Sequence, residues 1–213
     1  MVTTIKGKII DADSHVVETE RTWDFMEPDE QKYRPVLYGS LDGTGKRAWN
    51  IGGKIRETTF TLNRQQLAEL SKKQGFELNL SPEGRDLDDI GARLAHMDDL
   101  DVDVQILFPT LMLRPIADKV RLESVLCRSY NRWLADIWQQ GRGRLRWTCV
   151  VPTLVMDEAI EQMRTAKENG AVGVFMRPFE GERIMTDPYF HPLYEEAERL
   201  DLPITVHISN GNP

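Results

Sequence analysis

Three side chains of this sequence have the chemistry of metal ligands. Asp13 and His15 are separated by one residue, just after a short apolar run. Side chains two residues apart on a strand point to the same side, so this pair can hold one ion. His207 follows a second apolar stretch, at residues 203–206. One carboxylate and two imidazoles suit zinc or manganese, with positions left open for water and substrate.

The spacing alone also allows a structural role for these residues. An Asp-x-His triplet occurs often by chance, and a His at a strand end is more often simply hydrogen-bonded than a ligand. Asp11, one pleat below Asp13, is expected at most to orient a ligand. Glu18 is expected to be a solvated charge.

Arg177 is a second candidate for the site. It ends a continuous apolar run at residues 171–176. Its guanidinium has the geometry to bind a substrate carboxylate in bidentate fashion. A structural ion pair with an Asp or Glu of a neighbouring loop is an equally good interpretation.

Hydrophobic spacing predicts the elements that must carry these residues. Apolar runs predict five main strands, at residues 8–15, 102–108, 147–151, 171–176 and 203–207. From residue 87 onward, apolar residues at helical spacing separate each strand from the next. Strands joined by helices pair in parallel, and near-continuous apolar strands are buried on both faces.

An α/β protein with this pattern is either a doubly wound sheet or a (β/α)8 TIM-type barrel. A doubly wound dinucleotide-binding sheet has a G-x-G-x-x-G after its first strand, which this sequence lacks. In a barrel the carboxyl ends of all strands share one mouth, where Asp13, His15 and His207 would converge. A barrel of this type has about 250 residues before insertions, so the sequence predicts an incomplete barrel with about five of eight strands.

The segment after the first strand differs from the rest. Residues 19–83 lack the alternation of strand and helix, and they contain Asp42-Gly43 and Gly52-Gly53 turns between extended stretches. We interpret them as an insertion with a small β-hairpin or meander. Residues 1–213 are otherwise expected to form one partial barrel domain.

Composition excludes several classes of partner. The formal charge of -7 leaves no basic stripe for nucleic acid or anionic lipid. No stretch approaches the roughly 20 apolar residues of a membrane helix, and the first residues have no signal-peptide core. The two cysteines, Cys127 and Cys149, lack metal-binding or redox spacing and are expected to be reduced core residues. A cytoplasmic location is the simplest expectation.

Several segments resemble one known family in the same order along the chain. They are IDADSHVVE at 10–18, RLAHMDDLDVDVQILFPT at 93–110, YNRW at 130–133, GVFMRP at 173–178 and LPITVH at 202–207. Together they resemble the amidohydrolase superfamily (amidohydrolase family 2), in the branch named for aminocarboxymuconate semialdehyde decarboxylase. The resemblance covers nearly the whole chain except the insertion.

The resemblance implies a (β/α)8 barrel with one catalytic divalent metal, zinc or manganese. It maps the family's first-strand ligand pair onto Asp13 and His15, and its fifth-strand His onto His207. Asp in place of the first His of a His-x-His pair favours a more oxygen-rich site, which makes manganese more plausible. A further catalytic His and Asp of the family have no counterpart before Pro213.

The implied activity is that of an enzyme of small-molecule catabolism. It would be a hydrolase or a non-oxidative decarboxylase that acts on an aromatic or unsaturated carboxylic acid, or on a related lactone or amide. The alternative is a truncated, inactive fragment of such an enzyme. The resemblance also allows a homodimer, for which the sequence shows no interface signal.

Overall fold

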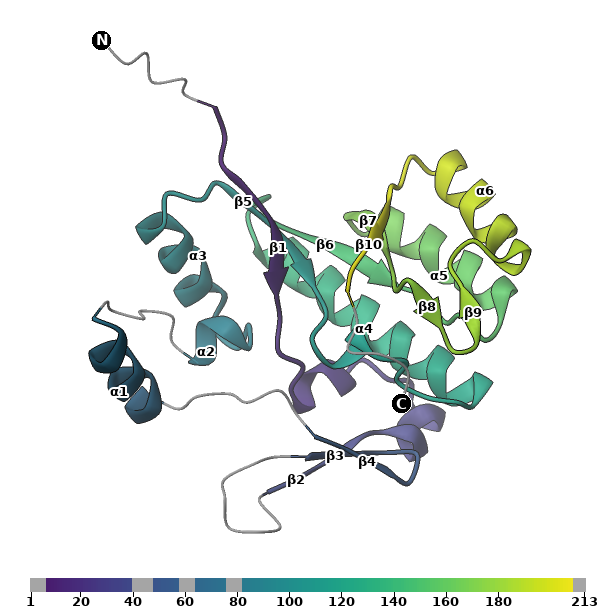
Figure 1. Cartoon of the computed structure of the whole chain (residues 1–213), viewed down its shortest axis with the longest axis horizontal. Coiled ribbons are helices and arrows are strands. Elements are labelled where there is room, and N and C mark those ends of the chain that lie inside the picture. The colour runs from purple at the N-terminus through teal and green to yellow at the C-terminus, as the bar shows by residue number, and fades with distance from the viewer. Residues whose placement is uncertain (1–6, 40–47, 58–63, 76–81, 209–213) are drawn as a thin grey trace.

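The centre of the molecule is a curled parallel sheet. The computed structural model describes residues 7–39, 48–57, 64–75 and 82–208. Its five-stranded sheet has the order β1-β5-β6-β7-β10, and all four pairings are parallel (Figure 1). The strands are β1 (Ile10–His15), β5 (Val104–Phe108), β6 (Leu145–Val150), β7 (Ala171–Met176) and β10 (Ile204–Val206).

The strand order separates the two predicted folds. Neighbours in the described sheet follow one another along the chain, whereas a doubly wound sheet reverses its order at a switch point. The doubly wound alternative is therefore wrong, and the fold is a TIM-type barrel of which the described residues contain five strands. Within the described residues, β1 pairs only with β5 and β10 only with β7.

Helices connect the successive strands of the sheet, as the periodicity predicts. They are α3 (Ile90–Asp99), α4 (Val120–Gln140), α5 (Met156–Glu168) and α6 (His191–Arg199). The carboxylate of Asp89 caps α3 by accepting the N–H of Ala92 at 2.9 Å. No helix in the described part of the chain is long and apolar enough to cross a membrane.

Some strand bounds differ from the predicted ones. Strand β5 begins at Val104 rather than at residue 102, because the chain first turns through Asp101, whose φ is 55°. Strand β6 begins earlier than predicted, at Leu145. Cys127 and Cys149 are free and buried in the core, as expected.

The insertion after β1 contains a three-stranded antiparallel meander, as predicted. Its strands are β2 (Val36–Tyr38), β3 (Ala48–Ile51) and β4 (Lys54–Glu57). Gly52 and Gly53 form the β3–β4 turn with φ values of 59° and 89°, which glycine adopts without strain. The predicted turn at residues 42–43 lies outside the described residues.

Other parts of the insertion are helical. Two short 3-10 helices (Glu20–Trp23 and Pro28–Tyr33) precede the meander, and α1 (Arg64–Gln74) and α2 (Pro82–Arg85) follow it. Helix α1 was not predicted. Within the insertion, the buried rings of Trp23 and Trp49 meet edge-on with centroids 6.0 Å apart. The hydroxyl of Ser129 on α4 donates to the carbonyl of Thr22 at 2.7 Å and so fastens the insertion to the barrel.

Candidate metal centre

The fold brings the three predicted ligands together at the carboxyl ends of the two outermost described strands. His15 is the last residue of β1, and His207 directly follows β10. Nε2 of His207 lies 3.2 Å from Nε2 of His15 and 3.2 Å from Oδ1 of Asp13. Nε2 of His15 lies 3.6 Å from the same Asp13 oxygen. These donor atoms thus form a nearly equilateral triangle.

The hydrogen bonds of the two imidazoles decide which nitrogen carries a proton. Nδ1 of His15 lies 2.8 Å from the carbonyl oxygen of Pro109, and Nδ1 of His207 lies 2.6 Å from that of Ile208. Because a carbonyl oxygen can only accept, both Nδ1 atoms must donate. In the neutral rings both Nε2 atoms then carry lone pairs, and these face the oxygen of Asp13. Three electron-rich atoms at such distances repel one another unless a proton or a metal cation lies between them.

The triangle has the dimensions of one face of a metal coordination shell. Ligands at about 2.0–2.2 Å from a tetrahedral ion are separated by about 3.3–3.6 Å. The separations here are 3.2 to 3.6 Å. The side chain of Asp13 is 72% exposed, whereas those of His15 and His207 are 33% and 19% exposed. The donor set therefore fits a divalent ion whose remaining positions are accessible from one side.

Asp11 holds the backbone that presents Asp13. Its carboxylate accepts the N–H of Asp13 at 3.1 Å, the hydroxyl of Ser14 and the side-chain N–H of Gln105 at 3.2 Å. Burial acts to raise the pKa of Asp11, but these hydrogen bonds outweigh it and lower the pKa below its ordinary value. The β1–β5 register shifts between Asp11 and Ser14, so β1 carries an irregularity next to the ligand pair. Nothing in the residue pattern of β1 predicts this irregularity.

Behind Asp11 lies a series of hydrogen bonds between side chains that was not predicted from the sequence. The Nε of Arg93 donates to Oε1 of Gln105 at 2.7 Å, and its Nη2 reaches the carbonyl of His15 at 3.5 Å. Burial lowers the pKa of Arg93, and the charge of Asp11 opposes that effect. The burial of Arg93 could hardly be predicted from its position in a helix, because nothing in the sequence distinguishes it from a surface arginine.

Glu18 is not the solvated charge that was predicted. Its side chain is 5% exposed and accepts the N–H groups of Thr110 at 3.1 Å and Leu111 at 2.8 Å. Burial raises the pKa of Glu18 from 4.5 to about 7, although the backbone N–H groups act to lower it. The prediction failed because Glu18 stands close to the exposed Glu20 in sequence, while its partners lie about 90 residues away.

A second buried glutamate fastens the loop after β6. Glu123, at the start of α4, accepts the N–H of Leu154 at 2.8 Å and the hydroxyl of Thr153 at 3.3 Å. Burial raises its pKa from 4.5 to about 7. Glu18 and Glu123 therefore have similar roles in the loops that follow two adjacent strands, since each accepts hydrogen bonds from backbone N–H groups of its loop.

Arg177 forms the structural ion pair that was one of its two interpretations. Its guanidinium is buried against Glu180, with Nε donating to Oε2 at 2.9 Å. Nη1 donates to the carbonyl of Met112 at 2.7 Å and reaches that of Arg114 at 3.4 Å. These contacts occupy the donors that a substrate carboxylate would use, so they do not support the substrate-binding role.

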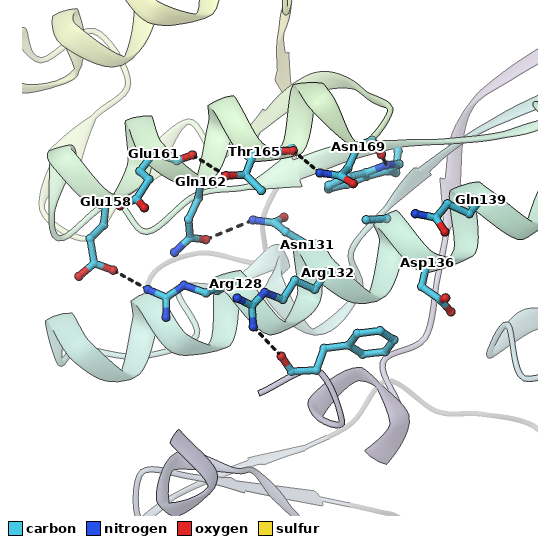
Figure 2. A pocket seen from close by; sticks show the side chains of 14 residues that line it. Arg128, Asn131, Arg132, Asp136, Gln139, Glu158, Glu161, Gln162, Thr165 and Asn169 are labelled. Atoms are coloured by element: carbon cyan, nitrogen blue, oxygen red, sulfur yellow. Dashed lines mark hydrogen bonds and ion pairs between the residues drawn. The ribbon is translucent and has the colours of Figure 1, made fainter. Parts of the chain in front are cut away.

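A separate cavity of about 480 Å³ lies between α4 and α5, outside the candidate centre. Figure 2 shows side chains of both helices along it, with the labelled Arg128, Asn131 and Arg132 on α4 and Glu158 and Gln162 on α5. Its charged groups are largely paired, for example Arg128 with Glu158 at 3.1 Å. Its lining includes none of the three candidate ligands.

Comparison with known proteins identifies the family. A family model described as amidohydrolase matches residues 10–213. No curated protein matches the chain. An amidohydrolase structure from Mycobacterium avium subsp. paratuberculosis is similar with a TM-score of 0.70 at 18% identity, over 97% of this chain and 60% of that one.

Two further similar structures come from different organisms. A 5-carboxyvanillate decarboxylase from Novosphingobium aromaticivorans, with bound manganese, has a TM-score of 0.58 at 18% identity over 97% of this chain and 52% of its own. IDCase from Metarhizium anisopliae has a TM-score of 0.59 at 14% identity, over 98% and 52%. At these identities the likeness shows the fold, and the chain spans only 52% to 60% of these structures. Because the family model covers nearly all of the sequence, the chain belongs to the amidohydrolase family.

Proposed function

We propose that Asp13, His15 and His207 bind one divalent metal ion in a metal-dependent enzyme of small-molecule catabolism. The observation that carries the proposal is the convergence of their lone pairs, with both Nδ1 atoms committed to carbonyl oxygens. Manganese and zinc both fit this donor set. The carboxylate ligand favours manganese, and the similar decarboxylase structure with bound manganese supports that choice.

The side chains prepare the site for such an ion. The carbonyls of Pro109 and Ile208 keep the two imidazoles in the form that presents Nε2. The carboxylate of Asp13 supplies negative charge on the exposed side of the triangle, where a substrate can approach. A bound divalent metal would act as a Lewis acid toward a carboxylate or carbonyl group, or would lower the pKa of a bound water towards about 7.

The reaction class follows from these two modes of metal chemistry. We propose hydrolysis or non-oxidative decarboxylation of an aromatic or unsaturated carboxylic acid, or of a related lactone or amide. The 5-carboxyvanillate decarboxylase among the similar structures favours decarboxylation. We also propose that the substrate is a small molecule, that nucleic acid and membranes are not partners, and that the chain forms a homodimer. The cytoplasmic location stays a prediction.

The alternative is that the 213-residue chain is an inactive part of such an enzyme. The observation that favours it is the exposure of apolar side chains along the outermost described strands. Ile10 of β1 is 56% exposed and Val206 of β10 is 49% exposed. Such edges invite pairing with further strands.

Elemental analysis of the purified chain tests the metal centre. After incubation with zinc or manganese and dialysis, the wild type is expected to retain about one ion per chain, because three ligands suffice for a catalytic-type site. Asp13→Ala and His207→Ala are expected to lose the ion. His96→Ala, a histidine outside the triangle, is the matched control and is expected to retain it. Equal metal content in all four proteins, or no bound metal in the wild type, would refute the proposal.

A further inference from the structure

We propose that Glu18 is a positioning residue that acts on His15 through a single peptide group. This inference rests on the proposed metal centre. The peptide group in question joins Pro109 to Thr110. Its N–H donates to Oε1 of Glu18 at 3.1 Å, and its C=O accepts from Nδ1 of His15 at 2.8 Å.

The geometry of a peptide group makes this connection a direct one. The group is planar and resonance-stabilised, with its N–H and C=O on opposite sides. Glu18 and His15 therefore bind the two ends of one dipole. A carboxylate at the N–H end draws the proton and shifts electron density towards the oxygen, so hydrogen bonds in such a chain strengthen one another. The carbonyl of Pro109 becomes a better acceptor for Nδ1–H.

A stronger bond at Nδ1 changes the other nitrogen of the ring. It holds His15 in the tautomer whose Nε2 is unprotonated, and it makes that nitrogen more basic. Many metal-binding histidines receive this support from a carboxylate in direct contact. In this chain the carboxylate of Glu18 would deliver it with one peptide group between them.

The surroundings of Glu18 match a carboxylate better than a neutral amide. Two N–H groups, from Thr110 and Leu111, converge on its two oxygens. A glutamine has only one oxygen acceptor, so its NH2 group would face one of these donors. The side chain is 5% exposed, and burying a carboxyl group costs free energy unless hydrogen bonds compensate for the lost water.

A purely structural role for Glu18 would be to fasten the loop after β5. Glu123 has that role in the loop after β6, where it accepts the N–H of Leu154 at 2.8 Å. Glu123 is similarly buried, at 2% exposed, and burial likewise raises its pKa to about 7. No bond in the described structure joins Glu123 to a candidate ligand. Glu123→Gln is therefore a matched control for Glu18→Gln.

The test measures metal affinity of the full 213-residue chain at pH 8, where both carboxyl groups are largely ionised. Zinc and manganese dissociation constants are obtained by competition with a chromophoric chelator. Loss of an outer hydrogen-bond partner typically weakens metal binding about 10–100-fold, and that is the expected effect of Glu18→Gln. Glu123→Gln is expected to stay within about threefold of the wild type. Equal affinities for Glu18→Gln and the wild type, or equal losses in both variants, would overturn the inference.

A spectroscopic measurement on the metal-free protein covers the case in which Glu18→Gln does not fold. With 15N-labelled histidine, the wild-type His15 is expected to show the Nδ1–H tautomer, with its signal assigned by comparison with His15→Gln. In folded Glu18→Gln the Nδ1–H proton signal is expected to move upfield, and in Glu123→Gln it is expected to stay. An Nε2–H tautomer in the wild type would refute the inference without any variant.

The two measurements also separate this inference from the metal centre. If the wild type binds no metal but His15 shows the Nδ1–H signal that depends on Glu18, the proposed metal function fails while the connection through the peptide stands. If the wild type binds metal and Glu18→Gln changes neither affinity nor signal, the metal centre stands and the role of Glu18 fails.

Discussion

Replacing Glu123 with Gln is expected to remove a pH-dependent loss of stability. The carboxyl group is 2% exposed, and burial raises its pKa from 4.5 to about 7. A carboxyl group with a raised pKa binds its proton more tightly in the folded state than in the unfolded state. Its contribution to stability is therefore complete below about pH 4.5 and is lost as the pH rises through about 7.

The size of the effect follows from the same values. At about 1.4 kcal/mol per pH unit, the difference between 4.5 and about 7 corresponds to about 3 kcal/mol of unfolding free energy. About 2.5 kcal/mol of this loss falls between pH 5 and pH 8. A glutamine at this position does not titrate. The unfolding free energy of Glu123→Gln, relative to the wild type, should thus rise by about 2.5 kcal/mol over that interval.

Urea unfolding at pH 5, 6, 7 and 8 measures this difference. Glu161→Gln is the control, because Glu161 is exposed on α5 and its replacement is expected to leave the pH dependence unchanged. If the difference between Glu123→Gln and the wild type is the same at pH 5 and pH 8, Glu123 does not titrate in this range. The reasoning from its burial would then be wrong.

Two further predictions concern buried contacts, both measured by urea unfolding. Arg177→Met leaves the carboxylate of Glu180 buried without its partner and is expected to cost about 3–5 kcal/mol, and Arg177→Met with Glu180→Leu should recover part of it. A double variant no more stable than Arg177→Met would contradict this. Gly170→Ala is expected to cost more than about 2 kcal/mol, because its φ is +86° and the new Cβ would lie 2.2 Å from the Trp138 ring. Gly181→Ala, with φ +64° and open space, should cost only about 1 kcal/mol, and equal costs would refute the steric argument.

Much of the barrel was predictable because its signals are local. Apolar runs and helical spacing located the five strands of the main sheet and the helices between them, with errors of a few residues at the ends. The pairing of Asp13 with His15 needed only the two-residue period of a strand. Placing His207 beside them needed the further inference that parallel strands end at one mouth. The structure brings these three together.

Other features could not be read from the sequence, because they depend on contacts between distant segments. Helix α1 in the insertion gave no clear amphipathic pattern, and its mean composition is strongly polar. The irregularity in β1 lies where Asp11 bonds with Ser14 and with Gln105 of the neighbouring strand. Glu180, the ion-pair partner of Arg177, is close to it in the sequence. Only the burial of both side chains in the folded chain favours the ion pair over substrate binding.

The sequence by itself determined the order of strands and helices, the insertion after the first strand and the three residues with metal-ligand chemistry. The tertiary structure decided the environment of each charge. A carboxylate such as Glu18 is solvated or buried according to which backbone N–H groups the fold brings to it, and those of Thr110 and Leu111 lie more than 90 residues away. Periodicity reports which side of an element is apolar, whereas the free energy of a buried charge depends on the atoms around it in space.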